Sequence, residues 1–311
     1  MSTIQVVSNG QMRAQSVSIQ VSDRTRCNGK CMFCISRVTP HASEGCATKL
    51  CNLNRCKVGL NFARYIGATH TILTSQADPT QENPDYLCEL TKTAREYTPF
   101  VDMHTNGLIL QKEGNNLLQR LTDAGLTMVT FSIASFDAAV DKALMGVAQN
   151  APKLIRLANS MELLVRCSLV VCKSGVHDFN GIMDYIKAAG ELGAHMVVIR
   201  EIWTPQTYND SNKEVADWNI ENKIDLAGME ATFKTVASNR NNEFGVSERD
   251  PLPWGTPVFA VGGIFSDKTH GVNVTFARCG EATRGPVIKS LIHKYNGHGY
   301  RNWDHNGDIL Y

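Results

Sequence analysis

The sequence predicts an α/β fold in which parallel strands alternate with helices, and three observations support this prediction. Six short apolar segments with the character of β-strands occur between residues 16 and 200. Segments with apolar residues at helical spacing separate them, and glycine follows several of these where helices commonly end. Strands that are joined through helices form right-handed βαβ units, and such units build a parallel sheet.

Taken in chain order, the predicted elements are short and are bounded by polar or glycine-containing segments. The predicted strands cover residues 16–21, 71–74, 100–104, 128–133, 163–171 and 196–199. The predicted helices cover residues 53–66, a segment that begins at 83, and residues 116–124, 152–161 and 179–192. Six units are fewer than the eight of a closed TIM barrel, so we expect a partial, open (βα)6 TIM-like barrel.

The last third of the chain differs in composition from the predicted barrel. Residues 208–222 are rich in Asn, Asp and Lys, residues 224–236 predict one more helix, and residues 272–276 predict a strand. We therefore expect two parts, a barrel over residues 1–204 and a C-terminal extension over residues 205–311 that covers the opening of the barrel.

The composition is that of an ordinary globular protein. Hydrophobic residues make up 43% and charged residues 20%, and the formal net charge of +1 indicates neither a nucleic-acid nor a membrane surface. The first 25 residues contain no apolar run of the kind found in signal peptides, and no stretch approaches a membrane span. We expect a cytoplasmic protein, in which the ten cysteines serve as metal ligands or buried thiols.

Three cysteines, Cys27, Cys31 and Cys34, form a C-x3-C-x2-C loop after the first predicted strand, with Phe33 before the last of them. Thiolates are soft ligands that suit iron–sulfur clusters and zinc. An ordinary 4Fe–4S cluster takes four cysteines, and so does a structural zinc site of this kind. Three cysteines would leave one iron open to a ligand that is not protein. The alternative is a zinc knuckle or three buried thiols, without catalysis.

Polar residues follow the predicted strands at their carboxyl ends, where open α/β sheets bind ligands. They are Ser75, Gln76, Thr105, Asn106, Gly107, Ser132, Lys173, Ser174, Arg200 and Glu201. Among them Arg200 and Glu201 are our candidates for residues that act on a substrate. The competing interpretation of these two is a surface ion pair.

The cysteine loop, the six βα units and the strand-end motifs together resemble the radical S-adenosylmethionine (SAM) superfamily over roughly residues 16–204. The closest likeness is to the branch of the molybdopterin-precursor GTP cyclases and the SPASM-type peptide maturases. The motifs that carry it lie at residues 23–28, 105–107, 131–135, 165–171 and 199–202. The paired C-terminal cysteines of that branch are missing, because Cys279 alone lies beyond Cys172.

This resemblance implies that Cys27, Cys31 and Cys34 hold a 4Fe–4S cluster whose fourth iron binds the amino and carboxylate groups of SAM. An external one-electron reductant of the flavodoxin or ferredoxin type would supply the electron that cleaves SAM. The resulting 5′-deoxyadenosyl radical would remove a hydrogen atom from the substrate.

The resemblance also implies a set of SAM contacts by position: Phe33, Gln76, Ala77, Asp78, Thr105, Ser132 and Arg166. Gln76, Ala77 and Asp78 stand where the superfamily has Gly-Gly-Glu, which receives the methionine amine. Thr105 and Ser132 would face the methionine and ribose groups, and Phe33 the adenine. Arg166 would pair with the SAM carboxylate, for which a guanidinium is well suited.

Cysteines recur at five-residue intervals just after the loop, at Cys46, Cys51 and Cys56. They predict either an auxiliary iron–sulfur cluster or thiols in the core, since free cysteine is among the most buried residue types. The histidines at 293, 298 and 305 lie in a Gly- and Asn-rich tail, which we interpret as surface rather than as a metal site.

We expect a small polar, nucleotide-like substrate, because of the likeness to the GTP cyclases and the polar strand ends. Two alternatives stay open at this point. One is a maturase that acts on a peptide or protein, and the other is a non-catalytic iron–sulfur or zinc binding module. We expect no membrane or nucleic-acid partner.

Overall fold

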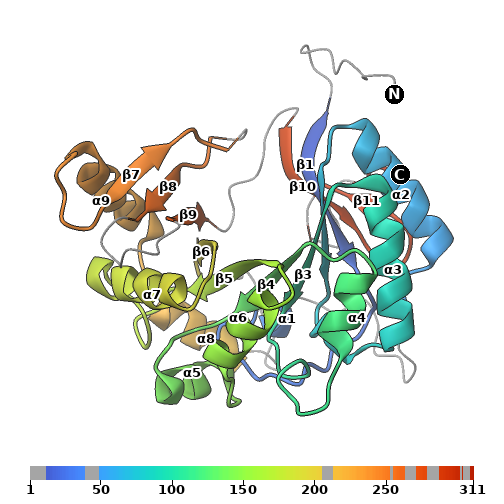
Figure 1. The fold of residues 1–311 in the computed structure, drawn as a ribbon, viewed down its shortest axis with the longest axis horizontal. Helices are drawn as coiled ribbons and strands as arrows, with labels where there is room; N and C mark the ends of the chain where they lie inside the picture. The colour runs from blue at the N-terminus through green and yellow to red at the C-terminus, as the bar shows by residue number, and fades with distance from the viewer. Residues whose placement is uncertain are drawn as a thin grey trace.

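The computed structural model describes residues 12–38, 49–204, 213–252, 255–262, 271–278, 287–301, 303 and 309–311. Within these residues a single curved sheet runs through the molecule, with helices packed on its outer face (Figure 1). Its eleven strands follow the order β11-β10-β1-β2-β3-β4-β5-β6-β9-β8-β7. The sheet does not close on itself, so the structure confirms the predicted partial, TIM-like barrel.

The strands of the barrel are consecutive and parallel neighbours. They are β1 (Arg13–Gln20), β2 (His70–Thr74), β3 (Phe100–Thr105), β4 (Met128–Ser132), β5 (Leu164–Val170) and β6 (Met196–Arg200). Short runs rich in Val, Ile and Thr form them, in which side chains alternate between the two faces. All six correspond to predicted strands.

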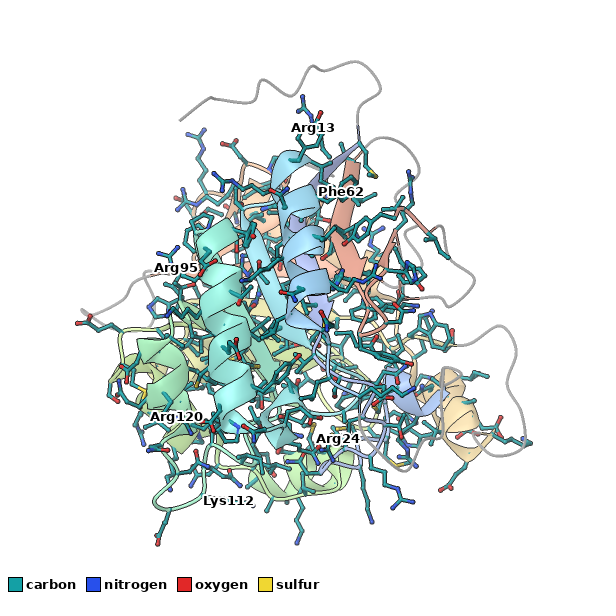
Figure 2. All side chains as sticks on the ribbon, turned by 90° about the vertical axis from the view of Figure 1, so that its right-hand side faces the viewer. Arg13, Arg24, Phe62, Arg95, Lys112 and Arg120 are labelled. Carbon is teal, nitrogen blue, oxygen red and sulfur yellow. The ribbon has the colours of Figure 1, made fainter. Side chains whose placement is uncertain are left out.

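Helices connect the strands and begin at polar caps. They are α1 (Ile35–Val38), α2 (Leu53–Tyr65), α3 (Pro84–Tyr97), α4 (Leu117–Asp123), α5 (Ala138–Met145), α6 (Ala151–Asn159), α7 (Phe179–Glu191), α8 (Lys213–Asn222) and α9 (Leu226–Ser238), with a short 3-10 turn η1 (Pro79–Gln81). The side chains of Asn52 and Asn83 accept hydrogen bonds from the first turns of α2 and α3. These two helices lie side by side over the sheet (Figure 2). The five helices predicted for the barrel are α2, α3, α4, α6 and α7, and the helix predicted over residues 224–236 is α9. The helices α1, α5 and α8 were not predicted.

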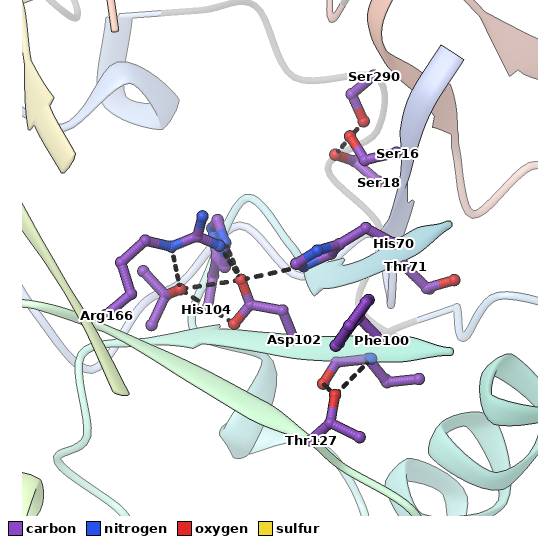
Figure 3. A network of polar contacts seen from close by, with 12 residues as sticks. Ser16, Ser18, His70, Thr71, Phe100, Asp102, His104, Thr127, Arg166 and Ser290 are labelled. Atoms are coloured by element: carbon purple, nitrogen blue, oxygen red, sulfur yellow. Dashed lines mark hydrogen bonds and ion pairs between the residues drawn. The ribbon is translucent and has the colours of Figure 1, made fainter. Parts of the chain in front are cut away.

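The strands separate an apolar outer face from a polar inner face. Leu73, Met103 and Phe131 are fully buried under the helices on the outer face. The residues next to these in each strand point to the inner face, and many of them carry polar groups. Examples are Ser18 of β1, whose hydroxyl lies 2.9 Å from that of Ser290, and Asp102 of β3 (Figure 3). The inner face of the barrel is therefore where polar chemistry is possible.

The C-terminal extension adds strands to both edges of the barrel. On one side β10 (Val287–His293) runs parallel to β1, with β11 (Gly299–Tyr300) beyond it. On the other side β9 (Val272–Ala277) runs parallel to β6. The strands β8 (Val258–Val261) and β7 (Val246–Arg249) extend the sheet beyond β9 as antiparallel neighbours. The boundary at residue 204 and the covering of the opening stay predictions. Within the described residues, no helix is both long enough and apolar enough to span a membrane.

Candidate functional site

The cysteine loop leaves the carboxyl end of β1 and is held from one side by α5. The backbone amides of Lys30 and Met32 donate to the carbonyls of Met145 and Leu144 at 2.9 and 3.0 Å. Gly146 follows α5 with φ 68°, and a Cβ there would lie 2.8 Å from the Cβ of Lys30. Only glycine adopts this conformation without strain while leaving room for the loop. Because α5 was not predicted, this support for the loop was missed as well.

Segments after β2 and β3 hold the loop from the other side. The backbone amide of Asn28 donates to Gln81 Oε1 at 3.0 Å. The side-chain Nδ2 of Asn106, just after β3, donates to Asn28 Oδ1 at 2.7 Å and lies 3.7 Å from Cys27 Sγ. Arg24 pairs with the buried carboxylate of Glu82 at 2.6 Å. The loop is therefore fixed at the edge where the strands of the barrel end.

The three thiols of the loop are partly exposed and close to one another. A Cβ built on Gly29 would lie 3.7 Å from Cys31 Sγ and 3.9 Å from Cys27 Sγ. Burial raises the pKa of Cys31, and the neighbouring charges of Cys34 and Cys27 raise it further. Burial also raises the pKa of Cys27. Three thiolates in this position would need a compensating positive charge, which a bound metal would supply.

An unpartnered donor beside the thiols fits a cluster. In the part of the chain that the structure describes, Asn28 Nδ2 is buried without a hydrogen-bond partner. Hydrogen bonds to sulfur are one of the means by which proteins tune iron–sulfur clusters. The residues present at the loop are thus compatible with a 4Fe–4S cluster.

Phe33 lies on an apolar wall next to the loop. With Cys31 it packs against a small buried group at the ends of the later barrel strands and on α5: Ala134, Leu144, Met145, Cys172 and Ile202. A flat apolar surface beside the cysteines is what an adenine ring requires. That role of Phe33 stays a prediction.

Asp78 joins the ends of β2 and β3. Its buried carboxylate accepts hydrogen bonds from two backbone amides, those of Thr80 at 2.9 Å and Asn106 at 2.5 Å. It also accepts one from the Thr105 hydroxyl at 2.9 Å. Burial raises the pKa of Asp78, and these hydrogen bonds oppose the shift. Asp78 therefore orients Thr105 and Asn106, and a direct contact with SAM stays a prediction for it, as it does for Gln76 and Ala77 just before it.

Thr105 and Ser132 lie at the ends of adjacent strands, as the sequence indicated. Thr105 is buried, and its hydroxyl accepts from the Gly107 amide at 2.9 Å. Ser132 ends β4, and its carbonyl accepts from Gln149 Nε2 at 3.0 Å. The same Gln149 nitrogen donates to the carbonyl of Asn106 at 2.6 Å. Gln149 therefore ties the two strand ends together next to the loop.

Arg166 belongs to a buried network deeper in the barrel (Figure 3). It faces Thr130 across β4 and β5, two residues below Ser132. Arg166 Nε donates to the Thr130 hydroxyl at 2.9 Å, and the guanidinium forms an ion pair with Asp102. Asp102 is fully buried and also accepts from His104 Nε2 at 3.0 Å. Arg166 thus has a partner within the protein, and its contact with the SAM carboxylate stays a prediction.

The charges of this network fix its protonation. Burial tends to raise the pKa of Asp102, but Arg166 and His104 outweigh it and hold that pKa well below its usual range. Burial lowers the pKa of His104, Asp102 opposes this shift, and the charges of Arg166 and Arg200 add to the lowering. At neutral pH the network therefore contains an ionised Asp102 and a neutral His104.

Arg200 and Glu201 end β6 at the same edge of the barrel. Arg200 Nε donates to the Ser168 hydroxyl at 2.8 Å. Glu201 is mostly buried and pairs with Lys223 at 3.1 Å. Both residues thus lie where a substrate site was expected, and their roles stay predictions.

Two features of the site were not recognised in the sequence. The first is the network around Asp102 and His104, although polar residues at alternate positions of β3 were a visible signal. The second is the contact of Asn106 with the cysteine loop, because the sequence placed Asn106 at a strand end without revealing that contact. Of the predicted auxiliary set, Cys46 lies outside the described residues, whereas Cys51 and Cys56 are buried.

Comparison with solved structures defines the class of fold. The solved structures that resemble this chain are radical SAM enzymes, so the chain has the fold that the sequence predicted. No family model and no curated protein matches the chain.

Among solved structures, the chain is similar to Streptococcus suis SuiB bound to its precursor peptide SuiA, with 14% identity and a TM-score of 0.61. This similarity covers 97% of the chain and 63% of SuiB, so the chain spans less than two thirds of that protein. SuiB bound to S-adenosylmethionine matches with 14% identity and a TM-score of 0.58 over 96% of the chain and 61% of SuiB. The hydrogenase maturase HydG from Carboxydothermus hydrogenoformans matches with 14% identity and a TM-score of 0.50 over 74% of the chain and 51% of HydG.

Proposed function

We propose that this protein is a radical SAM enzyme in which Cys27, Cys31 and Cys34 hold a 4Fe–4S cluster beside a bound SAM molecule. The observation that carries the proposal is the position of the three thiols at the carboxyl end of β1, fastened to α5 and to the segments after β2 and β3. Cluster and SAM together supply a one-electron cleavage that yields a 5′-deoxyadenosyl radical. An external reductant of the flavodoxin or ferredoxin type would deliver the electron.

The residues of the chain would position SAM and keep water away from it. Gln76, Ala77, Thr105 and Ser132 are proposed contacts because they lie at or just after the ends of β2, β3 and β4. Phe33 contributes an apolar wall. Arg166 donates through Nε to Thr130 and pairs through Nη2 with Asp102, so Nη1 is the nitrogen proposed to meet the SAM carboxylate.

We propose a small polar, nucleotide-like substrate bound on the polar inner face, in contact with Arg200 and Glu201. Arg200 Nε donates to the hydroxyl of Ser168, which shares one face of β5 with Arg166, so this guanidinium lies on the inner face of the barrel. Guanidinium groups bind phosphate and carboxylate through paired hydrogen bonds. A peptide substrate is the second candidate, and the similarity to a peptide-bound SuiB favours it.

The test of the cofactor chemistry is anaerobic reconstitution with iron and sulfide, followed by measurement of 5′-deoxyadenosine under strong reductant. Wild type should cleave SAM, and Cys31→Ala should not. Cys88→Ala is the matched control, because Cys88 is also half-buried but lies on α3 away from the loop. Cluster binding without SAM cleavage would contradict the proposal and favour the non-catalytic module.

The substrate is tested by calorimetric titration of SAM-loaded protein with a panel of nucleotides and short peptides. Arg200→Ala should weaken binding of an anionic small molecule about 10- to 100-fold, since a hydrogen bond to a charged group is lost. Arg249→Ala, on the outer strand β7, is the control and should bind as wild type does. Binding of peptides alone would replace the first candidate by the second.

A further inference from the structure

A second group of soft ligands lies apart from the cysteine loop, between α2 and the C-terminal strand β10. Cys51 precedes α2, Cys56 lies in its first turns, and His293 ends β10. One ligand atom from each lies within 4.8 Å of those of the other two. The three residues are almost completely buried, at 1%, 0% and 0% exposure respectively.

The fold brings these residues together from distant parts of the sequence. Strand β10 pairs with β1 so that His293 lies opposite Ile19. The backbone amide of Cys51 donates to the Val21 carbonyl at 2.9 Å, which places the start of α2 beside the end of β1. The group is thus a product of the parallel pairing of β10 with β1, and spacing in the sequence does not reveal it.

The histidine is oriented as a metal ligand. His293 Nδ1 lies 3.0 Å from the Tyr311 hydroxyl. Its other nitrogen, Nε2, is buried and has no hydrogen-bond partner among the described residues. Metal-ligating histidines commonly use one ring nitrogen for a hydrogen bond of this kind, which fixes the ring and leaves the other nitrogen for the metal.

The helix also makes room for this arrangement. A Cβ built on Gly59 of α2 would lie 2.5 Å from both His293 Nδ1 and the Tyr311 hydroxyl. Glycine within a helix normally weakens it, so its presence here has a packing reason. The Tyr311 ring in turn packs edge-on against Phe62 of the same helix, with ring centroids 5.1 Å apart.

Two thiols and an imidazole that are buried together form a donor set suited to a divalent ion. Such an ion would bind both sulfurs as thiolates.

We propose that Cys51, Cys56 and His293 supply three of the four ligands of a single zinc ion that fastens β10 to α2. Zinc takes this donor set in tetrahedral sites, with Zn–S about 2.3 Å and Zn–N about 2.0–2.1 Å. Those bond lengths place ligand atoms about 3.5–3.8 Å apart, within the separation found here. A 4Fe–4S cluster, by contrast, spreads its cysteines over several irons. The proposed site is therefore mononuclear, unlike the auxiliary iron–sulfur cluster that was one of the two interpretations of these cysteines in the sequence.

Metal analysis of the full-length, reconstituted protein tests the proposal. Wild type should contain one zinc per chain, and zinc-edge X-ray absorption should show sulfur and imidazole ligands. Cys56→Ser and His293→Gln should lose the zinc. Cys88→Ser and His177→Gln, which alter a half-buried cysteine and an exposed histidine elsewhere, should retain it.

A milder variant keeps the test valid if the ligand variants do not fold. Tyr311→Phe retains the ring and removes the hydroxyl that orients His293, so it should weaken zinc binding about 10- to 100-fold in competition with a chelator. The triple variant Cys27→Ala/Cys31→Ala/Cys34→Ala should lose the cluster and keep the zinc, which separates this inference from the proposed function.

Three results would overturn the proposed zinc site. The first is wild-type protein that contains no zinc after growth in zinc-supplemented medium, and the second is a zinc content that Cys56→Ser and His293→Gln leave unchanged. The third is enough iron and sulfide for a second cluster, in an amount that depends on Cys56.

Discussion

The two groups of soft ligands differ in how the chain assembles them. Cys27, Cys31 and Cys34 belong to one loop, are partly exposed, and border the inner edge of the barrel. Cys51, Cys56 and His293 come from segments that are far apart in the sequence, and all three are buried. Exposed ligands next to a polar lumen suit a cofactor that reacts, whereas buried ligands between two elements suit an ion that holds them together. The contrast predicts separate consequences for activity and for stability.

The largest expected effect concerns activity. Cys31→Ala should reduce 5′-deoxyadenosine formation to the background of the assay, because two thiolates do not retain the cluster. Its melting temperature without cluster should stay within a few degrees of that of wild-type protein without cluster, since the thiol is partly exposed. Calorimetry of both proteins checks this point. A large loss of stability would break the distinction between the two sites.

The buried network around Asp102 should contribute to stability without any metal, so a variant there shows how much a buried ion pair contributes by itself. Asp102→Asn should lower the free energy of unfolding by about 3–5 kcal/mol, because Arg166 loses its buried partner. Iron and zinc contents should not change.

The same variant should change the pH dependence of stability. The folded pKa of Asp102 is depressed, so its contribution is present above its unfolded pKa of about 3.9 and is lost as the pH falls toward the folded value. The difference between wild type and Asp102→Asn should therefore shrink below about pH 4. Urea denaturation across the acid range measures it, and a difference that is constant with pH would refute the assignment.

Removal of zinc should have a smaller effect on stability than Asp102→Asn. If zinc is present at a hundred times its dissociation constant, its removal should cost about 3 kcal/mol. A chelator that strips zinc but leaves the cluster should lower the melting temperature accordingly, and added zinc should restore it. Cys56→Ser should show no response to the chelator. A chelator effect of equal size in that variant would remove the structural role of the ion.

The smallest effects are expected at two glycines that permit close approach. Gly146→Ala should displace the cysteine loop from α5 and reduce SAM cleavage about tenfold, by a cost of about 1–3 kcal/mol for strain at positive φ. Its zinc content should be normal.

Gly59→Ala should disturb the proposed zinc site and leave the cysteine loop intact, because its methyl group would push against His293 and Tyr311. Zinc affinity should fall and SAM cleavage per cluster should stay unchanged. If both glycine variants altered both sites, the two groups of ligands would be coupled rather than separate.

The barrel and its cysteine loop were predictable because their signals are local. Alternation marks β1 to β6, helical spacing marks the helices between them, and three cysteines in eight residues mark the loop. The remaining features depend on pairing between distant segments. The sequence of β10 does not say that it lies beside β1, so His293 was taken for part of a surface tail. Arg166 was placed at the right strand, but its pairing with Asp102 requires the register between β3, β4 and β5.

The parallel pairing of β10 with β1 also constrains the order of folding. During synthesis, β1 is made long before β10, the strand that completes its outer edge. Until then β1 has one unpaired edge, which is a template for wrong pairing with other chains. Closing so long a loop is entropically slow. A chain that lacks residues 287–293 would therefore leave one edge of β1 open to wrong pairing.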